Sequence, residues 1–110
     1  MVGRSIRQFG KNAQLVSLRG EPIEATAKLP DGREVRVWIG VPADAYREFN
    51  TVDIELSLVG GNHLAAINTV LEANQTSEAL ELSREIVRGL ESGELEPTAA
   101  ALEPLADQPR

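Results

Sequence analysis

The stretch PIEATAKLPDGREVRVWI, residues 22–39, decides the fold of this chain. Apolar and polar side chains alternate on both sides of Pro30-Asp31-Gly32, the apolar positions being Ile23, Ala25, Ala27 and Leu29, then Val35, Val37 and Ile39. Period-two alternation is typical of a strand with one buried face, and Pro, Asp and Gly each favour a tight reversal. The sequence therefore predicts a β-hairpin with its turn at residues 30–32.

Trp38 is out of register with the apolar side of this hairpin. It shares the polar side of its strand with Glu34 and Arg36. An aromatic side chain on a polar face is typical of contact hot spots, although coverage by another part of the chain is the alternative. We identify Trp38 and Arg36 as candidate partner-binding residues.

Further strand patterns flank the hairpin. Residues 52–58 alternate cleanly between apolar and polar, and the shorter apolar run at residues 15–18 is a candidate third strand. Between the hairpin and residue 52, the pattern of residues 42–50 favours one or two helical turns, because Pro42 suits the first helical position.

Two consecutive amphipathic helices are predicted after Gly60-Gly61. The first spans residues 62–74, and the second spans residues 77–92 and ends at Gly93. The apolar side of the first would consist of Leu64, Ile67, Val70 and Leu71. We therefore expect an α+β fold: a mostly antiparallel sheet of three or four strands, with both helices packed on one face.

The domain organisation follows from these patterns. Residues 1–93 form a single domain that begins with a basic arm at residues 1–12. Residues 94–110 are rich in Pro, Ala and Glu, with too few large apolar residues to anchor them, so a mobile, acidic tail is expected. The alternative is a short helix, capped by Thr98, that docks only on a partner.

Composition narrows the possible functions. The 110-residue chain is 42% apolar and carries a formal charge of −6, which disfavours general nucleic-acid binding. The absence of Cys excludes disulfides and thiolate nucleophiles. No secretory leader or membrane-spanning run is visible, so we expect a cytoplasmic protein that does not bind membranes.

Positive charge gathers at the N-terminus, where the first twenty residues hold no acidic side chain. The cationic residues are Arg4, Arg7, Lys11 and Arg19. A solvated segment paired with the acidic half of the chain is the simpler interpretation of this charge. The functional interpretation is a contact region for a partner, together with Trp38.

The only histidine, His63, follows Gly60, Gly61 and Asn62 at the predicted start of a helix. Free N–H groups at helix N-termini bind anions, which makes these four residues a candidate anion or ligand site. A histidine on the rim of the core is the alternative, since the glycines lack the Lys-Ser/Thr ending of a phosphate loop.

Other chemistries have little support. Asp53 and Glu55 share one side of a predicted strand, but no acidic loop or second histidine accompanies them, so no metal or cofactor is assigned. Nothing resembles the Gly-x-Ser-x-Gly motif of serine hydrolases, and we assign no catalytic residue.

These observations favour a small non-enzymatic binding or regulatory protein that acts through protein–protein contact, with another protein or with itself as a homodimer. A nucleic-acid-associated protein that uses the basic arm and Trp38 is the second hypothesis. A small-ligand-binding domain or enzyme centred on residues 60–63 is the third.

Overall fold

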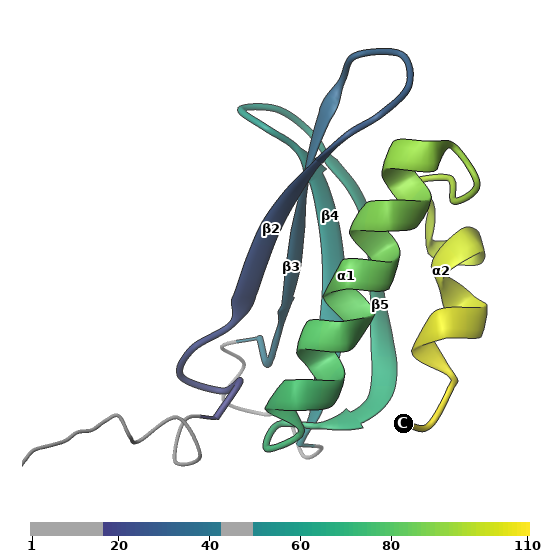
Figure 1. The fold of residues 1–110 in the computed structure, drawn as a ribbon. Helices are drawn as coiled ribbons and strands as arrows, with labels where there is room; N and C mark the ends of the chain where they lie inside the picture. The colour runs from purple at the N-terminus through teal and green to yellow at the C-terminus, as the bar shows by residue number, and fades with distance from the viewer. Residues whose placement is uncertain (1–16, 43–49) are drawn as a thin grey trace, which may run out of the picture.

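The computed structural model describes residues 17–42 and 50–110 and shows four strands followed by two helices (Figure 1). The strands are β2 (Ile23–Lys28), β3 (Glu34–Gly40), β4 (Thr51–Leu58) and β5 (His63–Glu72). The helices are α1 (Thr76–Ser92) and α2 (Ala99–Ala106). The protein is an α+β fold, as the sequence predicts.

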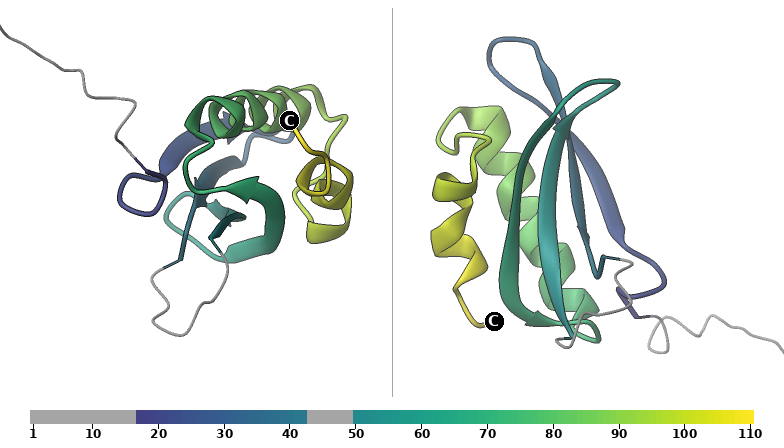
Figure 2. Two further views of the ribbon diagram at one scale, coloured as in Figure 1. Left: turned by 90° about the horizontal axis from the view of Figure 1, so that it is seen from below. Right: turned by 180° about the vertical axis from the view of Figure 1, so that it is seen from behind.

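The four strands form one antiparallel sheet in the order β2-β3-β4-β5. The sheet is twisted and curved, and its edge strands are β2 and β5 (Figure 2). Helix α1 packs against β2 and β3, whereas α2 lies along β5 at the opposite edge. Each strand pairs with the next one along the chain, which is the usual arrangement of consecutive strands.

The first hairpin is confirmed. The amide of Leu29 donates to the carbonyl of Arg33 at 2.8 Å, and Gly32 takes a φ of 96°, a backbone conformation that glycine adopts at little cost. The carboxylate of Asp31 accepts from the backbone amide of Arg33 at 3.0 Å and from its guanidinium at 2.9 Å. These contacts hold the pKa of Asp31 below its ordinary value.

The core fills the space between the inward face of the sheet and the two helices. Its largest fully buried side chains are Leu18, Val35, Val37, Ile39, Val52, Ile54, Leu56, Leu71, Leu82, Ile86, Leu90 and Leu102. All are aliphatic, and Trp38, the one aromatic residue among those described, does not belong to this cluster.

The prediction of a helix at residues 62–74 is wrong, because this segment is strand β5. The inward positions alternate at Ala65, Ile67, Thr69 and Leu71, while Val70, expected on the apolar side of the helix, is 46% exposed. A short apolar run supports both spacings, and pairing with β4 decides between them. Of the two consecutive helices that the sequence predicts, only the second is present, as α1. The other helix of the structure, α2, lies further along the chain.

The helix predicted at residues 77–92 is confirmed as α1, and Gly93 ends it with a left-handed φ of 82°. Its buried positions are Ala79, Leu82, Ser83, Ile86 and Leu90. The residue before the first helical position is Gln75, which makes no side-chain capping hydrogen bond.

The expectation that too few apolar residues follow Gly93 to anchor the chain is wrong. Leu102 and Ala106 of α2 are buried in the same core as the sheet. Thr98 caps the helix, since its hydroxyl accepts from the amide of Ala101 at 3.1 Å. At the end of the described chain, the guanidinium of Arg110 donates to the carboxylate of Glu85 at 2.7 and 2.9 Å.

The candidate third strand at residues 15–18 is described only from Ser17. Leu18 is buried in a turn, where its amide donates to Ala73 at 2.9 Å and its carbonyl accepts from Val41 at 3.3 Å, so this part of the run is not a strand. The helical turns predicted within residues 42–50 fall mostly on 43–49, outside the described residues.

Candidate functional site

Trp38 lies on the face of the sheet opposite the core. Its neighbours in β3, Val37 and Ile39, are fully buried on the inward face, so the indole points outward, where it is half-buried. No described helix packs on this outward face. The structure therefore places the only tryptophan of the chain outside the apolar interior.

The indole ring of Trp38 lies over Gly40, two residues further along the same strand. A Cβ built on Gly40 would lie 3.0 and 3.1 Å from two ring carbons of Trp38 and 2.8 Å from the Cβ of Pro22. The ring therefore occupies the space that a side chain at position 40 would need. This contact limits the space in which the indole can move, and a side chain that is already restricted loses less entropy on binding.

A shallow concavity of about 330 Å³ surrounds the indole. Three neighbouring strands and the start of β5 line it, through Glu24, Arg36, Trp38, Glu55, Ser57 and His63. The pairing explains the arrangement: Trp38 stands opposite Glu24 on one side and Glu55 on the other, and Ser57 stands opposite His63. The concavity thus brings together Trp38, Arg36 and His63, which the sequence assigns to two separate candidate sites.

Negative charge dominates the outward face of the described strands. Its acidic residues are Glu24, Glu34, Asp53, Glu55 and Glu72, and its cationic residues are Lys28 and Arg36. Within residues 17–42 and 50–110, the side chains of Arg36, Trp38 and His63 form no hydrogen bond or ion pair. These groups are therefore available to a partner.

The helix start on which the sequence based an anion site at residues 60–63 is not present, because strand β5 begins at His63. Gly60 and Gly61 turn the chain between β4 and β5, with a φ of 70° at Gly60, and the amide of Leu58 donates to Asn62 at 2.8 Å. No helix begins here, so the free N–H groups of a helix N-terminus are missing. Only His63 of the four residues lines the concavity.

The basic arm is mostly beyond the described residues. Arg4, Arg7 and Lys11 lie outside them, whereas Arg19 is exposed in a turn and its guanidinium donates to the side-chain oxygen of Asn50. Arg19 does not line the concavity around Trp38. The structure thus separates Arg19 from the other predicted contact residues that it describes.

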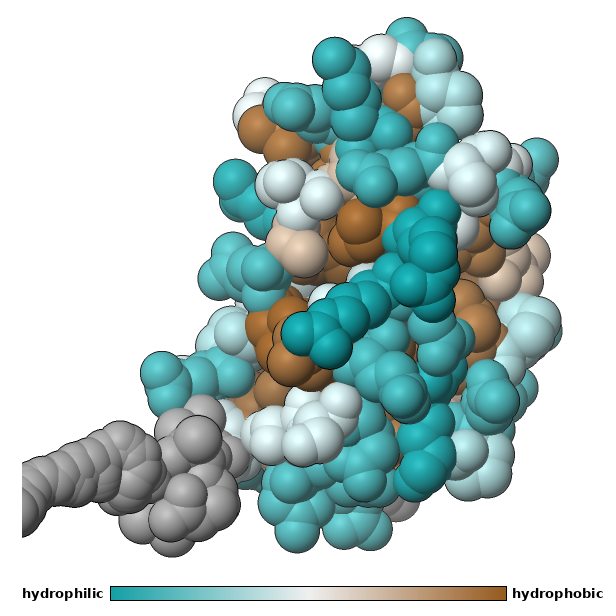
Figure 3. Space-filling model, viewed as in Figure 1, coloured by the Kyte–Doolittle hydropathy of each residue, from teal (hydrophilic) through white to brown (hydrophobic). Residues whose placement is uncertain are grey.

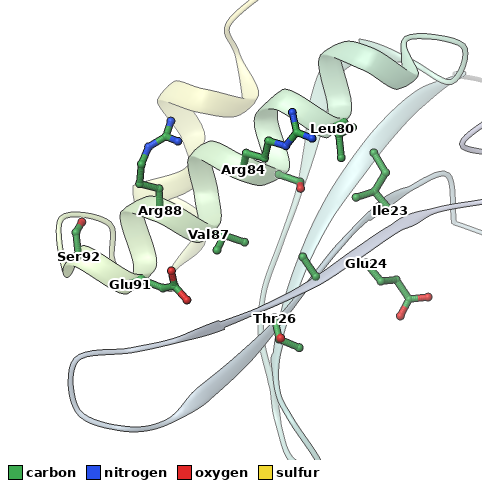
Figure 4. A pocket seen from close by; sticks show the side chains of 11 residues that line it. Ile23, Glu24, Thr26, Leu80, Arg84, Val87, Arg88, Glu91 and Ser92 are labelled. Carbon is green, nitrogen blue, oxygen red and sulfur yellow. The ribbon is translucent and has the colours of Figure 1, made fainter.

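A second hollow, of about 790 Å³, runs between β2 and α1. Figure 3 shows hydrophobic surface there, crossed by hydrophilic side chains, and Figure 4 shows Ile23 and Val87 pointing into it from the strand and the helix. Leu80 at its helix side is 40% exposed. This groove follows the edge of the sheet, whereas the Trp38 concavity lies on its outward face.

The described residues include no cluster of metal ligands. Among them, no group of three or more His, Asp or Glu side chains is placed to hold a metal ion. The side chains of Asp53 and Asn68 are joined instead by a hydrogen bond of 2.7 Å. The outward face can offer an aromatic surface, carboxylates and one guanidinium, which are the groups of a recognition surface.

The sequence prediction missed Glu24, Glu55 and Ser57 as members of the site. Period-two alternation places each on the outward face, but only the strand register brings them next to Trp38 and His63.

The chain is an antiparallel α+β protein whose sheet has an acidic outward face that none of the described helices covers. No protein-family model, curated protein or solved structure matches the chain. None of the helices among the described residues has the length and apolar character needed to cross a membrane.

Proposed function

We propose that this protein is a non-enzymatic binding protein that holds a cationic segment of a partner protein on the outward face of its sheet, at Trp38. The observation that carries the proposal is the half-buried indole flanked on both neighbouring strands by the carboxylates of Glu24 and Glu55. An aromatic face attracts guanidinium and ammonium groups, and adjacent carboxylates strengthen that attraction.

The electrostatics of the face support a basic partner rather than a nucleic acid. Phosphates would meet the carboxylates around Trp38, and the single guanidinium of Arg36 does not offset them. The hypothesis of nucleic-acid binding through Trp38 is therefore the weaker one. Cytoplasmic localisation remains part of the proposal.

Trp38 provides its own probe, because it is the only tryptophan in the chain. We expect a Gly-Arg repeat peptide to shift its fluorescence emission in a titration, and a Gly-Glu peptide of the same length to leave it unchanged. The shift should weaken with added salt, since exposed charges are screened over about 10 Å at 0.1 M salt.

Variants test the role of the carboxylates. Glu55→Gln should weaken binding of the arginine peptide several-fold, whereas Glu34→Gln, an outward carboxylate of β3 outside the concavity, should change it little. Trp38→Ala, followed by calorimetry, should abolish binding. Equal affinity for both peptides, or equal loss in the two glutamine variants, would refute the proposal.

A further inference from the structure

The strand β2 forms one end of the four-stranded order, with α1 packed against it on the inward side as α2 packs against β5. Its outer edge hydrogen-bonds to no other strand among the residues that the structure describes. An open edge presents unpaired N–H and C=O groups to any strand that can align with it.

The hairpin defines which groups face outward. Because the amide of Leu29 donates to Arg33, odd-numbered residues of β2 bond to β3, and alternation directs the N–H and C=O groups of Glu24, Thr26 and Lys28 to the open edge. The carbonyl of Glu34, opposite Lys28, accepts from Val59 on the far side, which agrees with this assignment.

We propose that β2 pairs antiparallel with β2 of a second copy of this chain, about a twofold axis at Thr26. Glu24 of each copy then stands opposite Lys28 of the other, and two ion pairs form across the joined edge. Lys28 has no ion-pair partner among the described residues of its own chain, so it is available for this contact.

The other twofold registers of this edge are less favourable. An axis at Glu24 or at Lys28 places like charges opposite each other. An axis at Ala25 pairs Lys28 with Pro22, and an axis at Ala27 pairs Glu24 with Pro30. Proline has no N–H to donate, so each of these registers loses hydrogen bonds at both ends.

The apolar contact of the joined edges comes from the groove beside them, because Ala27 is only 2% exposed within its own chain and adds little. The register sets Ala25 opposite Ala27 of the other copy, beside the groove between β2 and α1, where Leu80 is 40% exposed. A strand pair of this length buries less than the roughly 1,200 Å² of a standard interface, so the groove must contribute. We therefore expect a dimer with micromolar affinity.

The dimer would place two copies of the proposed binding site in one assembly, but its formation does not depend on the function proposed for Trp38. Joining the two β2 edges makes one eight-stranded sheet whose outward face carries two Trp38 sites. In each site Glu24 pairs with Lys28 of the other copy, and the carboxylate of Glu55 is left to the cationic segment. A partner with two cationic segments would then bind more tightly than one with a single segment, through effective concentration.

Charge exchange tests the register. In sedimentation equilibrium of the full chain, Lys28→Glu and Glu24→Lys should each weaken dimerisation roughly tenfold to a hundredfold, because two attractive pairs become repulsive. The double variant Glu24→Lys/Lys28→Glu should restore it. Two residues four apart along one strand are too distant for this rescue to arise within a chain.

A backbone variant provides an independent measurement. Thr26→Pro removes an N–H that points to the open edge, so it should abolish the dimer while circular dichroism stays unchanged. Thr26→Val keeps the N–H and should leave the dimer intact. A wild-type chain that stays monomeric at millimolar concentration would overturn the proposal, as would a double charge variant that fails to dimerise.

The two proposals fail separately. Trp38→Ala should leave the dimer intact, and loss of the dimer in this variant would move the interface to the outward face and refute the edge pairing. A dimer that does not bind the arginine peptide would refute only the function proposed for Trp38.

Discussion

Along β4, the inward side chains Val52, Ile54 and Leu56 are fully buried, whereas the outward residues of the same strand keep part of their surface. The inward side lies under the helices, and the outward side carries the charges around Trp38. One strand thus divides its side chains between a buried face and a partly exposed one, because successive side chains point to opposite faces. Substitutions on the outward side should therefore leave the stability of the core largely unchanged.

The largest expected difference between the faces is in the free energy of unfolding. Leu56→Ala should lower it by about 2–5 kcal/mol, because the deleted methyl groups leave a cavity in the core. Ser57→Ala, the next residue on the outward side, should change it by less than about 0.5 kcal/mol. Urea denaturation measures both, and similar losses would contradict the division between the faces.

A second pair of variants measures how much α2 contributes to the stability of the core. Leu102→Ala should cost about 2–3 kcal/mol, because Leu102 is fully buried with the sheet residues but sits on a short helix that can shift. Glu103→Ala, on the exposed side of α2, is the matched control. If both variants unfold at the wild-type urea midpoint, α2 contributes nothing to the core.

The third test concerns the support of the indole on the outward face. Gly40→Ala should displace the Trp38 ring, change its fluorescence and cost about 1–3 kcal/mol, because the new Cβ overlaps the ring and Pro22. Gly20→Ala is the control, since its nearest neighbour would be 4.0 Å away. An unchanged Trp38 emission in Gly40→Ala would show that the contact does not position the ring.

The smallest expected effect is the pH dependence of the contact between Arg110 and α1. Hydrogen bonding to Arg110 holds the pKa of Glu85 below its ordinary value, so the stabilisation is complete above that value and is lost as the pH falls through the lowered pKa. Because Glu85 is partly exposed, the loss should be below about 1 kcal/mol.

Glu85→Gln isolates this contribution. Thermal unfolding of the variant should depend less on pH in the acidic range than that of the wild type, and its stability near neutral pH should be slightly lower. Identical pH profiles for the two proteins would show that the ion pair between Arg110 and Glu85 does not stabilise the fold.

The site was predictable in part. Alternation alone placed Trp38 and Arg36 on the outward side of their strand, because one strand suffices for that inference. The meeting of Trp38 with His63 was not predictable, since it depends on the pairing of β4 with β3 and β5. The assignment of His63 to a helix start also hid its place beside Ser57.

Gly89 illustrates the same limit within α1. The sequence shows a glycine in a helix and leaves its purpose open. In the structure, a Cβ at this position would lie 2.8 Å from the Cβ of Leu95, whose amide donates to the carbonyl of Gly89 at 3.0 Å. The glycine allows the chain after α1 to return close to the helix, which positions α2.

Local rules acting over a few residues determined the hairpin turn at 30–32, the alternation of β4 and the end of α1 at Gly93. Only the tertiary structure decided that residues 63–72 form a strand and that α2 joins the core. Both outcomes depend on partners distant in the sequence: β4 provides hydrogen bonds for β5, and β5 provides an apolar surface for Leu102. A segment that suits two local structures takes the one whose backbone groups and apolar side chains the rest of the fold can satisfy.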